Sequence, residues 1–570
     1  MHRSFLLKLR QKNWKRAAER IGFSLFSAFL LCIPCFNGTM VNRGQKVQVL
    51  NRIGVLAEAM KNGTALRMIA FSQNFGYGYG STLFETNTAY YLPAYLHSHG
   101  MDLLKSFRVT VFLLFAGLIY ASILMASAVL KKGRLTTPLT ALLASSALCT
   151  YTALFNDGML EDISALIFLP VIITCLCRIV SKNGRTWLLL SVSIVLAYLC
   201  SPLYGVVYMM IAVLILLLHF RVLLARPRTL VRILAGVIVV SVFVLAQLIP
   251  RTVLLSRGDY VLNHISALSS RGVTLHDLFD VIPFAFDHMG KTPGLILLFF
   301  PWMIFRVKGK LRRRFAAECT AIGYALLFLS TTMFPWSLLP GGVRIIDPAR
   351  LLPASAVLLA VGAGFVFSEY PFPGKDRLNV RMAFAGITAA LLVLMIFTQY
   401  RYEGGIKDSY TGSELTSDSI IYGNTNSLAN RTETGEGWYL PNTKTGWRNT
   451  KRTVKRDGKT LSFVENSGVI LADTDRAGTF LFPRIWYPGY QLAVIENGKV
   501  KEVLDTDMDP ETGLVRAVVE DVSEAKLELR YERPGILQAG EIISVIGWIL
   551  LFSGIIGFYL FRTYGGNKHA

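Results

Sequence analysis

Two neighbouring carboxylates, Glu161 and Asp162, stand where a polar turn gives way to a long apolar run. The turn is formed by Asn156, Asp157 and Gly158, which are residues typical of tight turns. A carboxylate at the edge of a hydrocarbon layer is costly unless it faces protein or water. Such a group can accept the proton of an attacking hydroxyl. Glu161 is therefore a candidate catalytic acid/base, and a purely structural role is the open alternative.

A second candidate catalytic carboxylate, Glu85, lies in a long polar segment ahead of the second apolar run. A base could stand there if the segment covers an active site. The alternative is an ordinary carboxylate on an exposed loop.

Four arginines could bind an anion. Arg344 and Arg350 flank Asp347 in a short segment that we predict to lie outside the membrane, against the usual inward bias of basic residues. Arginine binds phosphate in a bidentate manner, so phosphate recognition is one hypothesis. An Arg–Asp bridge that holds the loop is the other. Arg52 and Arg67 could bind phosphate in the same way, or could extend toward water from an interfacial helix.

Aromatic residues accompany these charges. Tyr90 and Tyr91, like Tyr77 and Tyr79, could stack on sugar rings or could anchor the chain at a membrane interface. The sequence shows no metal-ligand motif and so does not identify a cofactor. A divalent cation is the open alternative. The histidines of one later loop are too widely spaced for a metal motif: His264, His276 and His288.

The elements that must position these residues are membrane helices. Apolar residues make up 52% of the chain and charged residues 17%, whereas soluble domains carry about 25% charged residues. We predict a polytopic α-helical membrane protein with about 12 transmembrane helices, each needing roughly 20 apolar residues. The spans are expected near 21–37, 108–130, 137–155, 163–181, 186–201, 204–220, 233–250, 293–305, 317–335, 353–368, 383–399 and 540–561.

The net charge of +22 reflects membrane topology in this interpretation and does not indicate nucleic-acid binding. Basic residues cluster before the first span and in the short loops near 131–134, 221–232 and 308–314. This pattern places those loops and both termini in the cytoplasm, where they can contact anionic lipid headgroups.

Three large segments then lie outside, at 38–107, 251–292 and 400–539. The first contains an amphipathic stretch from Val47 to Met60, which we expect to lie in the membrane interface. Short alternating stretches in the third, such as 490–495 and 514–519, predict a small antiparallel β-sandwich. The predicted organisation is a transmembrane domain at 1–399, an extracytoplasmic β-rich domain at 400–539, and a final helix with its tail at 540–570. All seven cysteines fall in predicted spans, so no disulfide framework is expected in the outer domain.

Several short segments, in their order along the chain, resemble one family of bacterial membrane proteins. They are residues 52–63, 74–79, 90–92, 161–170, 247–250, 338–340 followed by 348–352, and 486–490. In this order they resemble the YfhO-like and 6-pyruvoyl-tetrahydropterin-synthase-related membrane proteins, which have the GT-C fold of membrane glycosyltransferases. The resemblance covers nearly the whole chain.

The resemblance implies a hexosyltransferase-like enzyme in the bacterial cell membrane. A polyprenyl-phosphate-linked sugar would be the donor, and a surface glycan or lipid would be the acceptor at the outer face. Glu161 matches a glutamate of the family. Gln45 and Val49 replace an aspartate and a histidine, and the segment 200–203 lacks a histidine found in relatives.

These departures leave a second hypothesis, a catalytically inactive GT-C-like scaffold in cell-envelope assembly. A transporter is disfavoured, because the few charges within the predicted spans lie near the span ends and we find no internal repeats.

Overall fold

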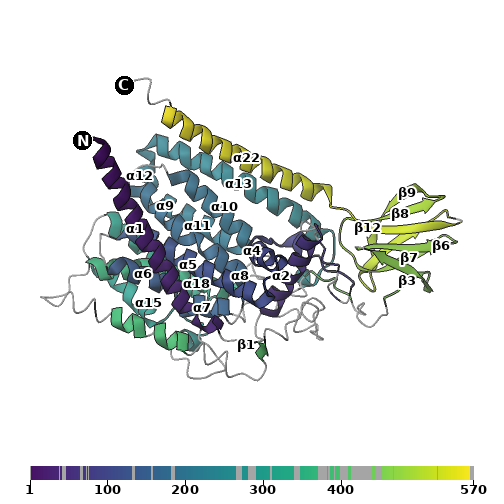
Figure 1. The fold of residues 1–570 in the computed structure, drawn as a ribbon, viewed down its shortest axis with the longest axis horizontal. Helices are drawn as coiled ribbons and strands as arrows, with labels where there is room; N and C mark the ends of the chain where they lie inside the picture. The colour runs from purple at the N-terminus through teal and green to yellow at the C-terminus, as the bar shows by residue number, and fades with distance from the viewer. Residues whose placement is uncertain are drawn as a thin grey trace. The chain divides into compact units, whose positions relative to one another are not determined.

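The computed structural model describes residues 2–36, 39–41, 46–63, 69–71, 74, 76–130, 135–155, 158–181, 186–264, 272–279, 291–307, 311–338, 347–369, 382, 385–390, 392–397, 409–411, 439–443, 452–466, 468–522 and 524–564. The chain divides into two compact units. One unit comprises 1–60, 86–237 and 266–417, and the other comprises 61–85, 238–265 and 418–570. Figure 1 shows the helices and strands of both.

Within the described residues, five helical segments are long and apolar enough to cross a membrane: Leu103–Val129, Leu160–Ser181, Pro227–Ser256, Pro348–Glu369 and Gly535–Ser553. A sixth is formed if the bent pair Thr136–Ser145 and Leu148–Phe155 counts as one span. Shorter apolar helices follow four of the six remaining expected runs, at Trp187–Cys200, Pro202–Leu218, Leu295–Arg306 and Ala385–Phe397. The chain is a membrane protein by these helices, and the count of twelve stays a prediction.

The first unit is a helical bundle with α18 (Leu352–Glu369) at its centre. This helix is buried along almost its whole length and packs against α16 (Leu311–Leu329) and α6 (Thr136–Ser145). Glycines permit this close approach, because a Cβ at Gly364 would meet Thr140 and a Cβ at Gly362 would meet Thr320. Helix α5 (Leu103–Val129) packs against α6 and α9 (Phe168–Ser181) and begins at Asp102, whose carboxylate accepts from the backbone N–H of Leu104 at 3.0 Å.

Arginines cap the carboxyl ends of three helices of this bundle. Arg226 donates to the carbonyl of Val180 at the end of α9 at 3.3 Å, and Arg314 donates to the carbonyl of Leu218 at the end of α11 (Pro202–Leu218) at 3.1 Å. Arg313 donates to the carbonyl of Phe305 near the end of η5 (Phe300–Arg306) at 2.8 Å. These contacts stabilise the negative ends of the helix dipoles.

The amphipathic stretch predicted from Val47 to Met60 is helix α2 (Lys46–Lys61), but its apolar face does not fit the expected membrane interface. Leu50 and Ile53 are fully buried, and Leu56 is 3% exposed. Protein side chains therefore cover the face that the sequence predicts to contact lipid.

The second unit contains two five-stranded antiparallel sheets (Figure 1). One has the order β10-β11-β7-β3-β4 and the other the order β5-β6-β12-β8-β9. Strands occupy the alternating stretches predicted at 490–495 and 514–519, and the Asn497–Gly498 turn joins β8 to β9 with positive φ at both residues. Packing of the sheets into one sandwich stays a prediction. The strands are β3 Val454–Arg456, β4 Lys459–Leu461, β5 Phe463–Asn466, β6 Val469–Thr474, β7 Gly478–Ile485, β8 Tyr490–Glu496, β9 Lys499–Asp505, β10 Asp507–Met508, β11 Leu514–Val519 and β12 Ala525–Tyr531.

The aromatic–glycine segment around residues 71–80 belongs to the core of this second unit. Tyr77 is 3% exposed and Tyr79 is 7% exposed. Arg484 of β7, fully buried, donates to the carbonyls of Phe71 and Gly76 and pairs with Glu465. These tyrosines are therefore packing residues and are not exposed for sugar stacking or membrane anchoring.

In the same unit, the second half of α13 (Pro227–Ser256) pairs with α22 (Gly535–Tyr564). Gln247 donates to Ser544 at 3.1 Å, and the rings of Phe243 and Trp548 lie 4.8 Å apart.

Candidate functional site

The candidate Glu161 and its neighbour Asp162 lie in the first turn of α8 (Leu160–Leu166), where the span Leu160–Ser181 begins. The amino-terminal end of a helix stabilises negative charge, which favours carboxylates at this position. Helix α4 (Thr88–Ser98) and the amino-terminal end of α11 pack against α8. Glu161 and Asp162 are adjacent in sequence but have different partners.

Glu161 pairs with Arg52 of α2, whose Nη1 lies 2.9 Å from its Oε1. The other two nitrogens of Arg52 also donate hydrogen bonds. Its Nε donates to Asn87 at 2.9 Å and its Nη2 donates to the Thr86 carbonyl at 3.0 Å. The guanidinium also lies over the ring of Tyr90, 4.4 Å from the centroid. Arg52 is thus held by four contacts and fixes the position of the Glu161 carboxylate.

Asp162 pairs with Arg350 of η7 (Pro348–Leu351) in a bidentate manner, with Nε to Oδ2 and Nη2 to Oδ1 both at 2.6 Å. Ser201, just before α11, donates to Oδ1 of Asp162 at 2.8 Å. Tyr204 donates to the Arg350 carbonyl at 2.6 Å. These contacts join α8, α11 and η7 at one point.

Arg350 pairs with Asp162 and not with Asp347, which is the partner that the sequence suggested. Asp347 accepts a hydrogen bond from the backbone N–H of Ala349 at 3.0 Å and so caps η7, while Asp162 binds the Arg350 guanidinium. The cap sets the start of η7 and helps to orient Arg350 toward α8.

The structure therefore brings Glu161, Arg52, Arg350 and Tyr90 together with Asp162, and we call this group the charge cluster. Tyr91 lies next to Tyr90 on α4 with 38% of its surface exposed. Glu85 belongs to the second unit, where it accepts from the Tyr439 hydroxyl at 3.0 Å. Two further predicted anion-binding residues lie outside the described residues: Arg67 and Arg344.

Three members of this site received no role in the sequence analysis: Asp162, Ser201 and Tyr204. Asp162 stood beside Glu161, and the Ser201–Pro202 pair was visible as a break between two apolar runs. Neither signal predicts which side chains meet, because Asp162 and Arg350 are 188 positions apart.

The charges of the cluster cancel, since two arginines face two carboxylates. Asp162 is 2% exposed, whereas the side chains of Glu161 and Arg350 are 20% and 26% exposed. A ligand at this surface could therefore reach Glu161 and Arg350. Glu161 can accept a proton there, and the Arg350 guanidinium can stabilise negative charge.

The described residues of the cluster do not fit a divalent cation. Each carboxylate already binds an arginine, and the described part of the chain holds no group of three His, Cys, Asp or Glu side chains arranged around a common point. Metal ions of this class need several oxygen ligands.

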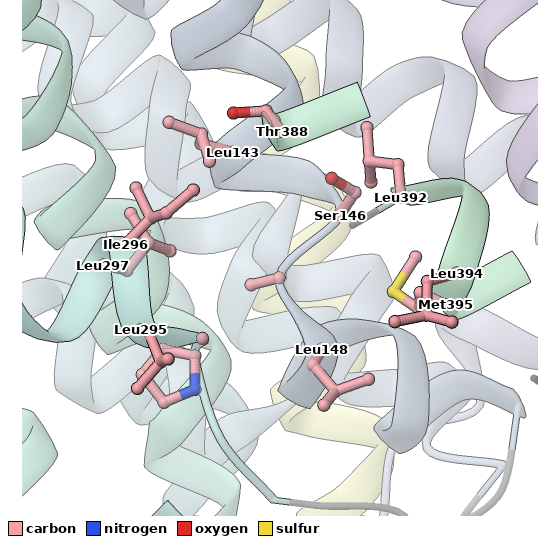
Figure 2. A pocket seen from close by; sticks show the side chains of 13 residues that line it. Leu143, Ser146, Leu148, Leu295, Ile296, Leu297, Thr388, Leu392, Leu394 and Met395 are labelled. Atoms are coloured by element: carbon pink, nitrogen blue, oxygen red, sulfur yellow. The ribbon is translucent and has the colours of Figure 1, made fainter. Parts of the chain in front are cut away.

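An apolar cavity of about 90 Å³ lies elsewhere in the first unit, at the 43° bend between α6 and α7 (Leu148–Phe155). Figure 2 shows Leu143, Leu295 and Met395 around it. Its two hydroxyl-bearing residues are Ser146 and Thr388, and the Ser146 hydroxyl donates to the Leu142 carbonyl at 2.6 Å. A cavity of this composition favours hydrocarbon over water.

Solved structures similar to this chain include two of the arabinofuranosyltransferase AftD from Mycobacteria, one of them a mutant form. The TM-score is 0.47 for each, with 14% and 13% sequence identity. The similarity covers 69% of this chain but only 27% and 28% of the AftD chains. No protein-family model and no curated protein matches the sequence.

Proposed function

We propose that this chain is a membrane glycosyltransferase that uses a polyprenyl-phosphate-linked sugar to modify a surface glycan or lipid at the outer face of a bacterial cell membrane. The observation that carries this proposal is the charge cluster at the start of the span Leu160–Ser181. Carboxylates and arginines at the start of a membrane span are costly to bury, and they commonly mark functional sites.

In the proposed reaction the acceptor hydroxyl gives its proton to the Glu161 carboxylate. Its oxygen forms a bond to the anomeric carbon of the donor sugar, and the bond between that carbon and the phosphate oxygen breaks. The phosphate keeps the electron pair, and Arg350 stabilises the growing negative charge. Arg52 positions Glu161 through the 2.9 Å ion pair.

The geometry distinguishes between the two described arginines that were candidates for phosphate binding. The Arg52 side chain is 11% exposed, and each of its three nitrogens donates a hydrogen bond within the protein. The Arg350 side chain is more exposed, at 26%, and two of its nitrogens donate to Asp162. These differences support Arg350 as the phosphate-binding residue and Arg52 as a positioning residue.

The same proposal includes the topology predicted from the sequence, with about 12 helices, cytoplasmic termini and an extracytoplasmic β-sandwich. The arginine contacts to Val180 and Leu218 support it, because arginines of the predicted cytoplasmic loops stabilise helix carboxyl ends that would lie on that side.

The experiment that tests this function compares a deletion strain with the same strain carrying the wild-type protein. We expect one surface glycan or glycolipid to lose a sugar on deletion and to regain it with the wild-type protein. Unchanged surface glycans and glycolipids in the deletion strain would contradict the proposal.

A second candidate function is an inactive scaffold in cell-envelope assembly. Val49, at the position of the family's histidine, is buried on α2 at 3% exposure and offers no polar group. Under this alternative the predicted outer domain carries the activity, so removal of residues 400–539 abolishes function while Glu161→Gln and Arg350→Gln have no effect. The transferase proposal requires both point variants to lose function.

A further inference from the structure

The Arg350 guanidinium binds Asp162 through its Nε–Nη2 edge, which is one of the edges through which arginine binds a phosphate. Both Nε and Nη2 donate to the carboxylate at 2.6 Å, which is the paired geometry of a bidentate anion contact. We propose that Asp162 is a built-in competitor for the anion at Arg350, so that it sets the affinity of the site for the phosphate of a lipid-linked donor. The inference rests on the proposed function and adds a specificity-determining residue to it.

The environment of Asp162 keeps this competitor in place. The side chain is 2% exposed, and Ser201 donates to the same Oδ1 atom that accepts from Arg350 Nη2. Arg350 is in turn fixed through its backbone, since Tyr204 binds its carbonyl and Asp347 caps η7. Neither partner of the pair can move far without breaking these contacts.

The charge balance of the cluster also supports a competitor role for Asp162. With Asp162 and Glu161 ionised, the two arginines are neutralised, and the cluster offers an entering anion little net attraction. Removing the charge of Asp162 alone would leave one positive charge in excess. The excess would lie at Arg350, because Arg52 remains paired with Glu161.

A phosphate that binds the Nε–Nη2 edge displaces the Asp162 carboxylate from at least one of its two bonds to Arg350. Ser201 can retain Asp162 during this exchange, because its hydroxyl donates to Oδ1 independently of the guanidinium. The site therefore binds the donor with moderate affinity. It also binds the spent carrier with moderate affinity, so that this product can leave.

The test measures binding of undecaprenyl phosphate to the purified full-length protein in lipid nanodiscs. Asp162→Asn keeps an oxygen that can accept from Ser201 and Arg350 but removes the competing charge. We expect it to tighten binding about tenfold. Glu58→Gln, on the exposed surface of α2, removes the same charge away from the cluster and should leave the affinity unchanged.

Two further variants locate the effect. Arg350→Gln should weaken binding of undecaprenyl phosphate, and the double variant Asp162→Asn/Arg350→Gln should bind as weakly as Arg350→Gln alone. Titration with uncharged undecaprenol should show no difference between wild type and Asp162→Asn. Titration with inorganic phosphate distinguishes a site for a lipid-linked phosphate from a site for free phosphate. At a free-phosphate site, Asp162→Asn would tighten the binding of inorganic phosphate but not the binding of undecaprenyl phosphate.

The outcomes separate this inference from the proposed function. If Arg350→Gln weakens binding but Asp162→Asn leaves the affinity unchanged or lower, the competitor role is wrong while the phosphate role of Arg350 stands. If Arg350→Gln has no effect, the phosphate role itself fails. Should Asp162→Asn not fold, Asp162→Glu replaces it. Its longer carboxylate cannot keep both 2.6 Å bonds, so a smaller rise in affinity is expected and an unchanged affinity would overturn the inference.

Discussion

At the scale of single residues, two adjacent carboxylates have different surroundings. Glu161 is partly exposed and is held by one arginine nitrogen, whereas Asp162 is buried and binds two nitrogens and a hydroxyl. The exposed carboxylate is suited to proton transfer and the buried one to holding Arg350. The sequence alone could not distinguish these roles, because both residues follow the same turn.

Arg350→Lys tests the role of the planar guanidinium. Lysine keeps the positive charge but cannot form two parallel bonds to a phosphate or a carboxylate. We expect the KM for the lipid-linked donor to rise about tenfold with a smaller change in kcat. Initial rates in membranes containing the variant would measure both constants. A fall in kcat at unchanged KM would show that Arg350 does not bind the donor's ground state.

At the scale of elements, the helix positions could be predicted from apolar run length, and the strands from alternation. The burial of α2 could not, because an amphipathic helix that lies on lipid and one that packs on protein have the same spacing of apolar residues. The pairing of α8 with η7 could not be predicted either, because it depends on contacts between residues far apart in sequence. Nearness along the chain suggested Asp347 as the partner of Arg350, although Asp347 caps η7.

The crossing of α6 and α18 gives a test at this scale. A Cβ at Gly364 would lie 2.7 Å from Cγ2 of Thr140, so Gly364→Val must push the two helices apart. We expect a lower melting temperature in detergent, equivalent to about 1–3 kcal/mol of destabilisation.

Gly22→Ala on α1 (His2–Leu31) is the matched control, because no heavy atom lies within 4 Å of the added Cβ. A Gly364→Val protein as stable as wild type would show that α6 and α18 do not cross as closely as described.

At the scale of the whole molecule, the distribution of arginine and lysine accounts for the proposed orientation. In the proposed orientation, basic residues in the short loops lie on the cytoplasmic side, and the sheets between Val454 and Tyr531 lie on the outer side.

Reporter fusions test this orientation. Alkaline phosphatase inserted at the Asn497–Gly498 turn should be active, because that enzyme folds only outside the cytoplasm, and the turn is a hairpin that tolerates insertion. Green fluorescent protein fused after Ala570 should fluoresce. An inactive phosphatase at the turn, in a protein that still reaches the membrane, would reverse the proposed topology.

The central claim is that Glu161 serves as the acid/base of a transferase that consumes a polyprenyl-linked sugar. The most direct measurement is mass spectrometry of polyprenyl-linked sugars in a deletion strain complemented with wild type, Glu161→Gln or Glu58→Gln. Glutamine can still accept the hydrogen bond from Arg52 but cannot take a proton from the acceptor, so the site should keep its shape and lose its activity. We expect the polyprenyl-linked sugar precursor to accumulate with Glu161→Gln and to return to the wild-type level with Glu58→Gln. Equal clearance of the precursor by wild type and Glu161→Gln would contradict it.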